Sequence, residues 1–422
     1  MKLILLTQYY PPETGAPQNR LADLAARFVA MGHEVTVLTA MPNYPVGQVY
    51  PGYRWRVFAR EHVNGIPVVR SWILATRNRS LLPRLITSLT FVVSSTIAGA
   101  FALSRADVLL TESPPLFLGM SGCVLARLKR ARFVMNVADL WIQAAVEMNV
   151  VKSRRLVRAA TWLEAGLYRS AAAVTAQTQG IKAAVERLAP EKSAYLFTNG
   201  VATDVFRPDV ARPDLIRDLG LEGRFIVGYA GIHGLAQALH TVVDAGEHLK
   251  SVPEIVITFF GDGPLKEELQ ARAAARGLTN VRFFPVQPKE AMPALTAAWS
   301  AGLVPLVASA IGRSALPSKM FEIMAAEVPV LVSAPAGEAT ALVDAAAGGL
   351  VVEPEDAERL AAAILQLHRD PALRRSLGQN ARRYVEQHFN RATIAANLAS
   401  YLTGIVTTGR APQPVRARVT GA

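Results

Sequence analysis

The sequence predicts an α/β protein built from two doubly wound, Rossmann-like domains. The length of 422 residues exceeds that of a usual domain and favours two. Short apolar runs alternate with helical or loop segments, and this alternation starts again after residue 218. Hydrophobic residues make up 51% of the chain and charged residues 18%, a composition that suits large buried sheets.

The first half of the chain begins as strand, loop, helix and strand. The apolar run at residues 2–6 leads into a Pro/Gly-rich loop, an amphipathic stretch at 18–30 and a second run at 35–38. Further apolar runs lie at residues 68–72, 108–110, 132–137, 173–176 and 194–197. This pattern is typical of a parallel sheet covered on both faces, and we expect a first domain at residues 1–208.

The second half repeats the alternation. Strands are expected at residues 225–229, 255–261, 281–284, 301–305, 330–332 and 349–352, with helices at 237–249, 264–276, 317–326, 355–369 and 371–388. The sequence therefore predicts a second Rossmann-like domain at residues 209–390, followed by an amphipathic helix at 391–405. Residues 406–422 lack a hydrophobic period and are expected to be disordered.

The cysteine content and the first residues bear on the compartment. Cys123 is the only cysteine, so no internal disulfide can form. The opening MKLILLTQYYPPE has four apolar residues in a row, too few for a signal peptide. We expect a protein of the reducing cytoplasm.

The net charge of +12 is concentrated in the first half. Residues 1–210 hold 24 Lys/Arg against 13 Asp/Glu, whereas residues 211–422 hold 21 against 20. This imbalance suggests that the first half meets an anionic surface or substrate. An arginine-rich genome is the alternative explanation.

Residues 85–104 form an uncharged segment as long as a membrane span. Because the segment lies between two expected strands of one sheet, a span would disrupt that sheet, and we expect a helix packed in the first domain. Part of it, with Leu81, Leu82 and the basic Arg77, Arg79 and Arg84, is a candidate for contact with the bilayer interface. Burial in the core is the alternative.

A glycine turn in the second half is a candidate phosphate-binding loop. The segment Tyr229–Gly234 follows a strand and precedes a helix, so Gly231 and Gly234 can bring backbone N–H groups close to a phosphate. A turn of this kind without a ligand is equally common in such domains.

The segment 315–325 carries more information. Pro317 suits the first helical turn, so the N–H groups of Ser318 and Lys319 would point at a phosphate, to which the Lys319 ammonium adds charge. Glu322 lies one turn on, placed to accept hydrogen bonds from vicinal hydroxyls such as those of a ribose. An acid that complements the helix dipole and a solvated lysine are the alternatives, but a nucleoside diphosphate explains both residues at once.

Several motifs in order resemble one family. They are QYYPPETGAPQNR, GHEVTVLT, MPNYPVGQVYPGY, NVADLW, TNGV, GYAGIHGLAQAL, GDGP and PSKMFEIMAAEVPVL. From residue 1 to about 395 the chain resembles the family 4 retaining glycosyltransferases of GT-B fold, in particular a bacterial subgroup that includes N-acetyl-L-fucosamine transferases of O-antigen and capsule synthesis. The resemblance implies two Rossmann-like domains facing a cleft, with the C-terminal helix returning toward the first, acceptor-binding domain.

The resemblance also implies roles for individual residues. It makes Glu322 the second glutamate of the family's E-x7-E motif, bonded to the donor ribose, and makes Ser318 and Lys319 part of the pyrophosphate site. Gly15 and Ala16 match the glycine loop that approaches the donor diphosphate, and Asp139 sits where a polar residue lies near the transferred sugar and the acceptor. The remaining donor-binding candidates are Gly231, Ile232, His233, Val286 at the nucleotide base, Ser314, Ala315 and Leu316.

The chain departs from the family pattern at two points. Ser314 stands where the first glutamate of E-x7-E would fall, which puts a carboxylate contact to the donor sugar there in doubt. The glycine turn also lacks the Arg and Lys that many members carry, leaving Lys319 as the expected cation, joined by Arg313 as a candidate. His233 is a candidate hydrogen-bond donor, and a solvated loop histidine is the alternative.

The expected chemistry needs no metal. The sequence has no Asp-x-Asp motif and its seven histidines are scattered, so neither a metal site nor another cofactor is expected. The resemblance implies same-face attack by the acceptor hydroxyl on a UDP-linked sugar (a hexose, N-acetylhexosamine or deoxysugar), with the departing phosphate taking the proton. Catalytic roles fall to Asp139, Lys319 and Glu322, although Asp139 could instead cap a helix.

The expected acceptor is a polyprenyl-diphosphate-linked or growing glycan, received by a basic first domain docked on the cytoplasmic leaflet. A nucleotide-sugar epimerase or a phosphorylase of the same fold is the rival enzyme. A nucleic-acid-binding protein is the rival from another class, but aromatic-interleaved basic strands are not evident and no nucleic-acid partner is expected.

Overall fold

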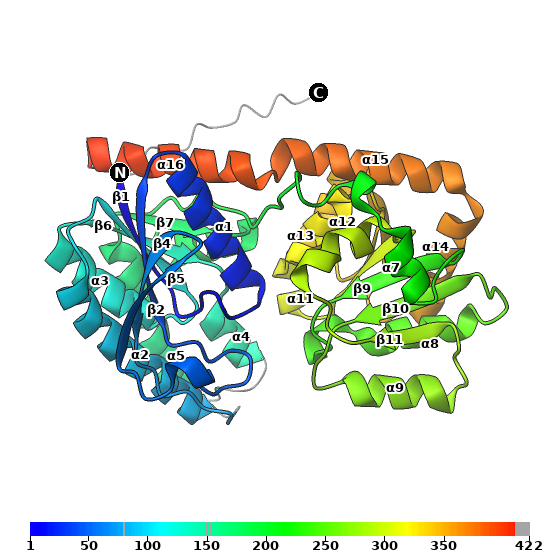
Figure 1. Ribbon diagram of the computed structural model, residues 1–422, viewed down its shortest axis with the longest axis horizontal. Helices are drawn as coiled ribbons and strands as arrows, with labels where there is room; N and C mark the ends of the chain where they lie inside the picture. Colours follow the sequence, from blue (N-terminus) through cyan, green and yellow to red (C-terminus); the bar gives the residue numbers. More distant parts are fainter. Residues whose placement is uncertain (79–80, 148–150, 152, 410–422) are drawn as a thin grey trace. The chain divides into compact units, whose positions relative to one another are not determined.

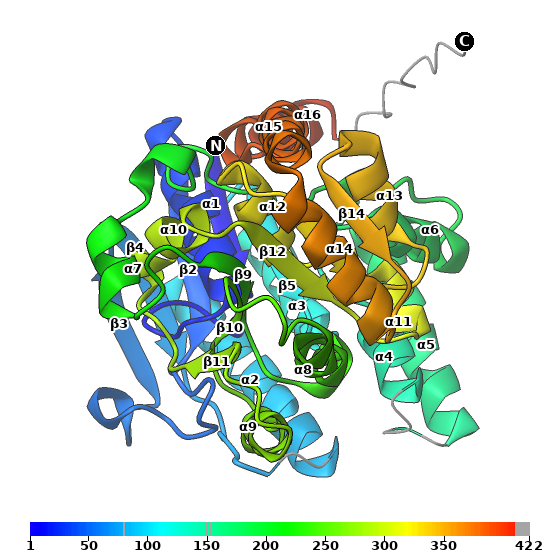
Figure 2. The same cartoon turned by 90° about the vertical axis from the view of Figure 1, so that its right-hand side faces the viewer.

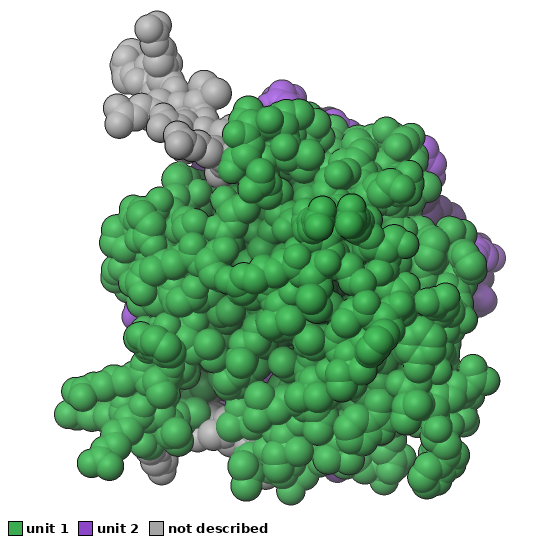
Figure 3. Space-filling view, turned by 90° about the vertical axis from the view of Figure 1, so that its left-hand side faces the viewer, with its two compact units in different colours: residues 1–198, 392–422 green, residues 199–391 purple. Residues whose placement is uncertain are grey.

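The computed structural model describes residues 1–78, 81–147, 151 and 153–409. These residues form two compact units, unit 1 with residues 1–198 and the segment from 392 onward, and unit 2 with residues 199–391 (Figure 3). The two units are described separately below.

Unit 1 contains an eight-stranded sheet in the order β3-β4-β2-β1-β5-β6-β7-β8 (Figure 1). Only β3 is antiparallel to its neighbour among these described strands. The strands are β1 (Lys2–Leu6), β2 (Glu34–Ala40), β3 (Phe58–Val63), β4 (Ile66–Ser71), β5 (Val108–Ser113), β6 (Arg132–Val137), β7 (Ala173–Ala176) and β8 (Tyr195–Leu196).

Helices cover both faces of this sheet. Leu21, Leu24 and Phe28 of α1 (Ala16–Ala30) share one apolar core with Leu398 and Leu402 of α16 (Arg391–Thr408). The core on the opposite face receives the inner sides of α2 (Leu81–Ala102), α3 (Leu118–Lys129), α5 (Arg154–Ser170) and α6 (Gln179–Leu188). A short helix, α4 (Trp141–Glu147), follows β6. The doubly wound first domain is therefore confirmed.

Unit 2 contains a parallel six-stranded sheet in the order β11-β10-β9-β12-β13-β14 (Figure 2). Its strands are β9 (Phe225–Ala230), β10 (Ile255–Phe260), β11 (Val281–Phe284), β12 (Ala301–Pro305), β13 (Val330–Ser333) and β14 (Gly349–Val352). Aliphatic and aromatic side chains on both faces of these strands are buried, as expected for a sheet covered on both sides.

Two apolar cores flank this second sheet. One is formed with α8 (Leu239–His248), α9 (Lys266–Ala275) and α14 (Ala357–Arg369). The other is formed with α10 (Met292–Ala297), α12 (Ser318–Ala325), α13 (Glu338–Ala346) and α15 (Pro371–His388). Two short helices, α7 (Pro213–Asp218) and α11 (Ala310–Ser314), precede β9 and α12. Both predicted Rossmann-like domains are present.

The expected boundaries differ from those in the structure. Residues 199–208 belong to unit 2 because Val201 is buried in its core, donates its N–H to Phe389 and accepts the N–H of Arg391. The last helix was expected at 391–405 and extends to Thr408, so the start of the expected disordered tail is helical. The rest of that tail, 410–422, lies outside the described residues.

The uncharged segment 85–104 forms most of α2. Its inner face packs against the sheet and α3, where Phe91, Ser95 and Gly99 are buried and the hydroxyls of Ser95 and Ser121 are 3.0 Å apart. The helix passes a length and hydropathy test for a membrane span, but only 28% of its most apolar window is buried in the protein. The helix is thus packed in the first domain as expected, while much of its outer face is uncovered.

Candidate functional site

The glycine turn of unit 2 follows β9, next to the point where the strand order reverses between β9 and β12. In open α/β sheets, ligands bind outside the carboxyl ends of strands at such a point. Gly231 has φ of +145°, donates its N–H to Phe260, and is followed by Ile232, whose carbonyl accepts the Tyr229 hydroxyl at 2.7 Å. These bonds fix the turn at the expected phosphate position.

Lys319 approaches this turn from the first turn of α12. Its Nζ lies 3.8 Å from the centroid of the Tyr229 ring. A Cβ atom placed on Gly231 would lie 2.8 Å from that same Nζ, so a residue with a side chain could not occupy this position without displacing the ammonium. The structure therefore brings together Gly231 and Lys319, which are 88 positions apart in the chain.

The helix that carries Lys319 begins at Ser318, with Pro317 at the N-cap. Since the first N–H groups of a helix have no partner inside it, Ser318 and Lys319 present backbone donors at this end. Burial lowers the pKa of the Lys319 ammonium to about 7, and its side chain has no ion pair among the described residues. A bound anion would satisfy the N–H groups and favour the charged ammonium.

Glu322 lies one turn along α12 from Lys319. Its carboxylate has no hydrogen bond or ion pair within the described part of the chain. Burial raises its pKa to about 7, while Arg391, Lys319 and Lys289 lower it. A partly buried carboxylate without a partner is an acceptor for hydroxyl donors, as the sequence predicts for a ribose.

For His233, the alternative of a solvated loop histidine is wrong, and its role as a hydrogen-bond donor stays a prediction. Its side chain is fully buried rather than solvated, and its ring packs among Tyr229, Phe259 and Phe283 with centroid distances of 5.9, 5.8 and 6.3 Å. Neither ring nitrogen has a partner among the described residues, and burial lowers the pKa of the imidazole to about 4. His233 is thus a neutral residue packed in the core beneath the turn. Its backbone N–H donates to the Asp262 carbonyl and so helps to fix the turn.

The other donor-binding candidates of unit 2 surround α12 or end the neighbouring strands. Ile232 and Val286 are exposed after β9 and β11, and both are available for apolar contact. Ser314 ends α11, and Ala315 and Leu316 are partly buried in the segment leading to α12. The candidate cation Arg313 is exposed beside Ser314.

In unit 1, Gly15 and Ala16 lie at the start of α1, after β1 and at the strand-order reversal between β1 and β5. The sequence reasoning missed the residue that holds this loop. Glu13 is buried, and its carboxylate accepts the N–H groups of Tyr10, Asn43 and Tyr44 at 3.1, 2.7 and 2.8 Å. The sequence carries no signal for this role, because the partners of Glu13 are backbone N–H groups, two of them in the distant loop after β2.

Asp139 lies in an exposed position after β6, and α4 begins two residues later at Trp141. It shares the carboxyl edge of the sheet with Gly15. Beneath this edge runs a buried polar chain in which Glu112 accepts from Arg20 and from Asn136 at 2.7 Å, and Asn136 accepts from Thr175 at 2.6 Å. This chain links α1 to β5, β6 and β7 and fixes the loops above them.

The arrangement in unit 2 suits a ligand with both phosphate and hydroxyl groups. It supplies the Lys319 ammonium, the backbone N–H groups at the start of α12, and Gly231, whose backbone a ligand can approach closely because it has no side chain. The Glu322 carboxylate lies one turn further along the helix. No group of three or more His, Cys, Asp or Glu side chains that could hold a metal occurs within the described ranges. Lys319 and the backbone donors place positive charge at this edge.

Each of the two units matches the model of a known protein family. Residues 15–197 match the family model "Glycosyl transferase 4-like domain", and residues 212–384 match "Glycosyl transferases group 1". The chain is 30% identical over 378 residues to WcaI of Escherichia coli (strain K12), named as a colanic acid biosynthesis glycosyl transferase; the match covers 87% of this chain and 92% of WcaI.

Solved structures agree on the fold. Sucrose-phosphate synthase from Thermosynechococcus elongatus superposes with a TM-score of 0.74 at 20% identity, covering 96% of this chain and all of that one. Anabaena Alr3699/HepE, solved in complex with UDP, gives a TM-score of 0.71 at 19% identity with the same coverage. These are GT-B glycosyltransferase folds, and the chain belongs to the group 1 glycosyltransferases with a glycosyltransferase 4-like first domain.

Proposed function

We propose that this glycosyltransferase moves a sugar from a UDP-linked donor to a lipid-linked or growing bacterial surface polysaccharide, with retention of the anomeric configuration. The observation that carries the proposal is the first turn of α12, where Lys319 meets Gly231 and the Glu322 carboxylate lacks a partner among the described residues.

The donor half of the proposal follows from these side chains. The diphosphate would receive N–H donors from the helix start and the turn, together with the Lys319 ammonium. Glu322 would accept hydrogen bonds from the ribose hydroxyls, and Val286 would contact the base. The solved relative Alr3699/HepE binds UDP and UDP-glucose, which supports uracil as the base.

The mechanism needs charge stabilisation at the leaving diphosphate. Fixed donors and an ammonium stabilise the charge that develops as the glycosidic bond to phosphate breaks, and we infer that no divalent metal is required. The acceptor hydroxyl attacks from the same face and passes its proton to the departing phosphate. Asp139 would orient the acceptor or the sugar.

The proposed acceptor is supported by the similarity to WcaI and by the positive charge of the first half of the chain. WcaI is named for colanic acid biosynthesis, and this supports a glycan acceptor here. The excess of basic residues in the first half supports a peripheral position on the anionic inner face of the cell membrane. The N-acetyl-L-fucosamine subgroup expected from the sequence stays a prediction, as does the sugar.

A donor screen tests the proposal. The purified protein is incubated with UDP-, GDP- and dTDP-sugars and membrane lipid extract, and nucleoside diphosphate release is measured with and without EDTA. We expect release from a UDP-sugar, unchanged by EDTA, with kcat/KM lowered about tenfold to hundredfold in Glu322→Gln. Absence of release from every donor, or a Glu322→Gln variant equal to wild type, would contradict the donor assignment.

The same reaction separates the rival enzyme. An epimerase would release a free sugar without an acceptor, whereas a transferase forms a glycosidic product. Nuclear magnetic resonance of that product gives the anomeric configuration, and an inverted anomer would contradict retention.

A further inference from the structure

The outer face of α2 is apolar where a covering helix is normally polar. Large apolar side chains are exposed at spacings of three and four residues along one side of the helix, and Phe101 is 88% exposed. They are Leu82, Ile86, Leu89, Val93, Ile97 and Phe101. This row, here called the α2 stripe, extends over about 28 Å at the helical rise of about 1.5 Å per residue.

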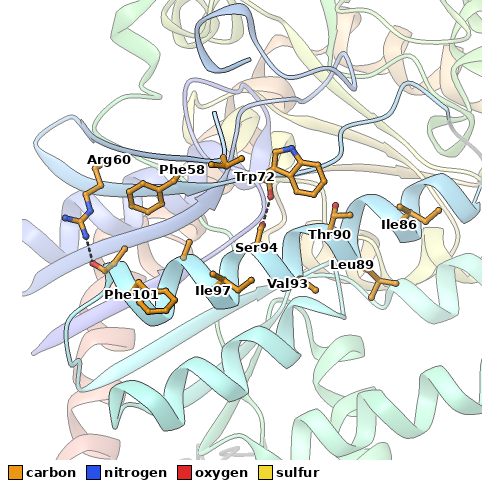
Figure 4. A pocket seen from close by; sticks show the side chains of 13 residues that line it. Phe58, Arg60, Trp72, Ile86, Leu89, Thr90, Val93, Ser94, Ile97 and Phe101 are labelled. Atoms are coloured by element: carbon orange, nitrogen blue, oxygen red, sulfur yellow. Dashed lines mark hydrogen bonds between the residues drawn. The ribbon is translucent and has the colours of Figure 1, made fainter. Parts of the chain in front are cut away.

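A groove of about 870 Å³ lies between the α2 stripe and the β3–β4 hairpin (Figure 4). The hairpin side is formed by Val57, Phe58 and Trp72, and the fully exposed Trp55 lies just before them. Figure 4 shows Ile86, Leu89, Val93, Ile97 and Phe101 in a row along the helix, with Phe58 and Trp72 above them. Hydrocarbon thus lines the groove from two elements.

Each polar side chain named here in the groove already forms a hydrogen bond within unit 1, although the exposed Arg60 guanidinium keeps further N–H donors. The Ser94 hydroxyl donates to the Trp72 carbonyl, the Thr90 hydroxyl donates to Thr87 at 2.8 Å, and the Arg60 guanidinium donates to Ala102 at 3.2 Å. A polar ligand would find few free partners there, so the groove suits a hydrocarbon chain.

The positive charge around the groove indicates which partner would supply a hydrocarbon chain. Residues 54–105 contain eight arginines and one acidic residue, Glu61, whose carboxylate pairs with Arg70. Arg54, Arg56 and Arg77 are exposed on the same segment. A second copy of this chain would bring the same positive charge, whereas an anionic bilayer offers hydrocarbon and negative headgroups together.

The inner face of α2 limits how the helix can meet a bilayer. Phe91 is buried in the unit 1 core, and a Cβ on Gly99 would lie 2.7 Å from Leu125 of α3. Because this face is packed, only the α2 stripe is available, and the helix would lie in the interface plane rather than span it.

We propose that the α2 stripe and the β3–β4 hairpin dock on an anionic phospholipid bilayer, and that the groove between them takes a hydrocarbon chain of a bilayer lipid. This inference rests on the membrane position proposed above and names its surface. Its test measures binding without transfer, so its failure and the failure of the transferase assignment are distinguishable.

Vesicle flotation tests the docking surface. Vesicles of equal parts phosphatidylglycerol and phosphatidylcholine are compared with phosphatidylcholine alone, using wild type and Val93→Glu/Ile97→Glu. We expect wild type to float with the anionic vesicles and the double variant to lose at least tenfold in bound fraction. The control Val29→Glu alters an exposed valine of α1, on the opposite face of the sheet, and should bind like wild type.

A folding check keeps the comparison interpretable. The double variant should retain the thermal unfolding midpoint of wild type and its release of nucleoside diphosphate from donor in solution. Equal flotation of wild type and the double variant, or no wild-type binding to anionic vesicles, would overturn the docking surface.

Fluorescence quenching tests the groove itself. Phosphatidylglycerol brominated in its acyl chains should quench tryptophan emission of the bound protein, and Trp72→Phe should remove a large part of that quenching. Trp162→Phe, which removes an exposed tryptophan of α5, is the matched control and should leave it intact. Quenching unaffected by Trp72→Phe would overturn the assignment of a chain to the groove.

Discussion

Lys319 and Glu322 place two groups that titrate near neutrality on one turn of one helix. Burial is the first cause for both, lowering the pKa of the ammonium and raising that of the carboxyl, each to about 7. The form suited to a diphosphate and a ribose has a charged lysine and an ionised glutamate. In the free protein, each charge is therefore lost on a different side of pH 7.

This pair predicts a bell-shaped pH profile of kcat/KM for the nucleotide-sugar donor, with its maximum near pH 7. Activity should fall above pH 7 because Lys319 loses its proton, and below pH 7 because Glu322 gains one. Lys319→Arg keeps its charge and should extend activity to higher pH, whereas Glu322→Gln should remove the acid limb. Initial rates at low donor concentration from pH 5 to pH 9 measure both, and an unchanged alkaline limb in Lys319→Arg would refute the assignment.

Gly231 predicts a strong effect from one added methyl group. Its φ of +145° is strained for any residue with a side chain, and a Cβ atom there would lie 2.8 Å from the Lys319 Nζ, so the ammonium would have to move. Gly231→Ala should displace the ammonium and lower donor kcat/KM about tenfold or more. Gly234→Ala is the control, because Gly234 has φ of −120° and a Cβ there would meet the flexible end of Gln237. Similar losses in both variants would contradict this role for the contact with Lys319.

At the scale of elements, the loop before α1 depends on a contact that is not local in sequence. The Glu13 carboxylate joins the loop after β1 to the loop after β2 through three backbone N–H groups. The buried Arg70 adds a bond to the Ala40 carbonyl at 3.1 Å and another to Pro11. These contacts fix where Gly15 and α1 begin.

Glu13→Gln should weaken this loop, because an amide keeps one acceptor oxygen where the carboxylate offers two. We expect unit 1 to lose about 1–3 kcal/mol of stability and donor KM to rise. Urea unfolding and donor titration measure the two effects, with Glu34→Gln as the control, since Glu34 forms an exposed ion pair with Lys2. A Glu13→Gln variant as stable as that control would contradict the role of Glu13.

The elements that the sequence predicted well are those with local signals. Pro317 before an amphipathic run located α12, and its spacing to Glu322 placed the carboxylate one turn above the helix start. The strand β3 was not predicted, because FAREHV mixes charged and apolar residues at the edge of the sheet, where one side meets solvent.

Contacts between distant segments could not be read from the sequence. His233 looked like a loop residue, but aromatic residues of β10 and β11 enclose its ring. The meeting of Lys319 with Tyr229 and Gly231 depends on the order of strands in the sheet. Glu13 acts through backbone groups 30 and 31 positions away, for which no residue pattern exists.

At the scale of the whole molecule, the end of the described chain completes the unit that contains its beginning. Leu398, Leu402 and Ile405 of α16 are fully buried in the core with Leu3, Leu5 and Phe28. Tyr401 also stacks on Tyr195 of β8, with ring centroids 4.2 Å apart. Unit 1 is therefore discontinuous in sequence, while unit 2 is one unbroken segment.

Removing one of these C-terminal side chains should destabilise the N-terminal unit. Leu398→Ala is expected to cost about 2–5 kcal/mol because it leaves a cavity in a packed core. Thermal unfolding should show the loss in the transition of unit 1, and donor binding to unit 2 should persist. Thr403→Ala, on the exposed side of the same helix, is the control. A Leu398→Ala variant as stable as that control would show that α16 contributes little to the core.

The discontinuity of unit 1 also sets an order of folding during synthesis. After residue 198 leaves the ribosome, all of unit 2, residues 199–391, must be made before α16 can cover its side of the first sheet. At about 5–20 residues per second this interval lasts roughly 10–40 seconds. Unit 2 can thus reach its native state first, although it is made second, and the apolar strip that awaits α16 stays exposed to chaperones until residues 392–408 have left the ribosome.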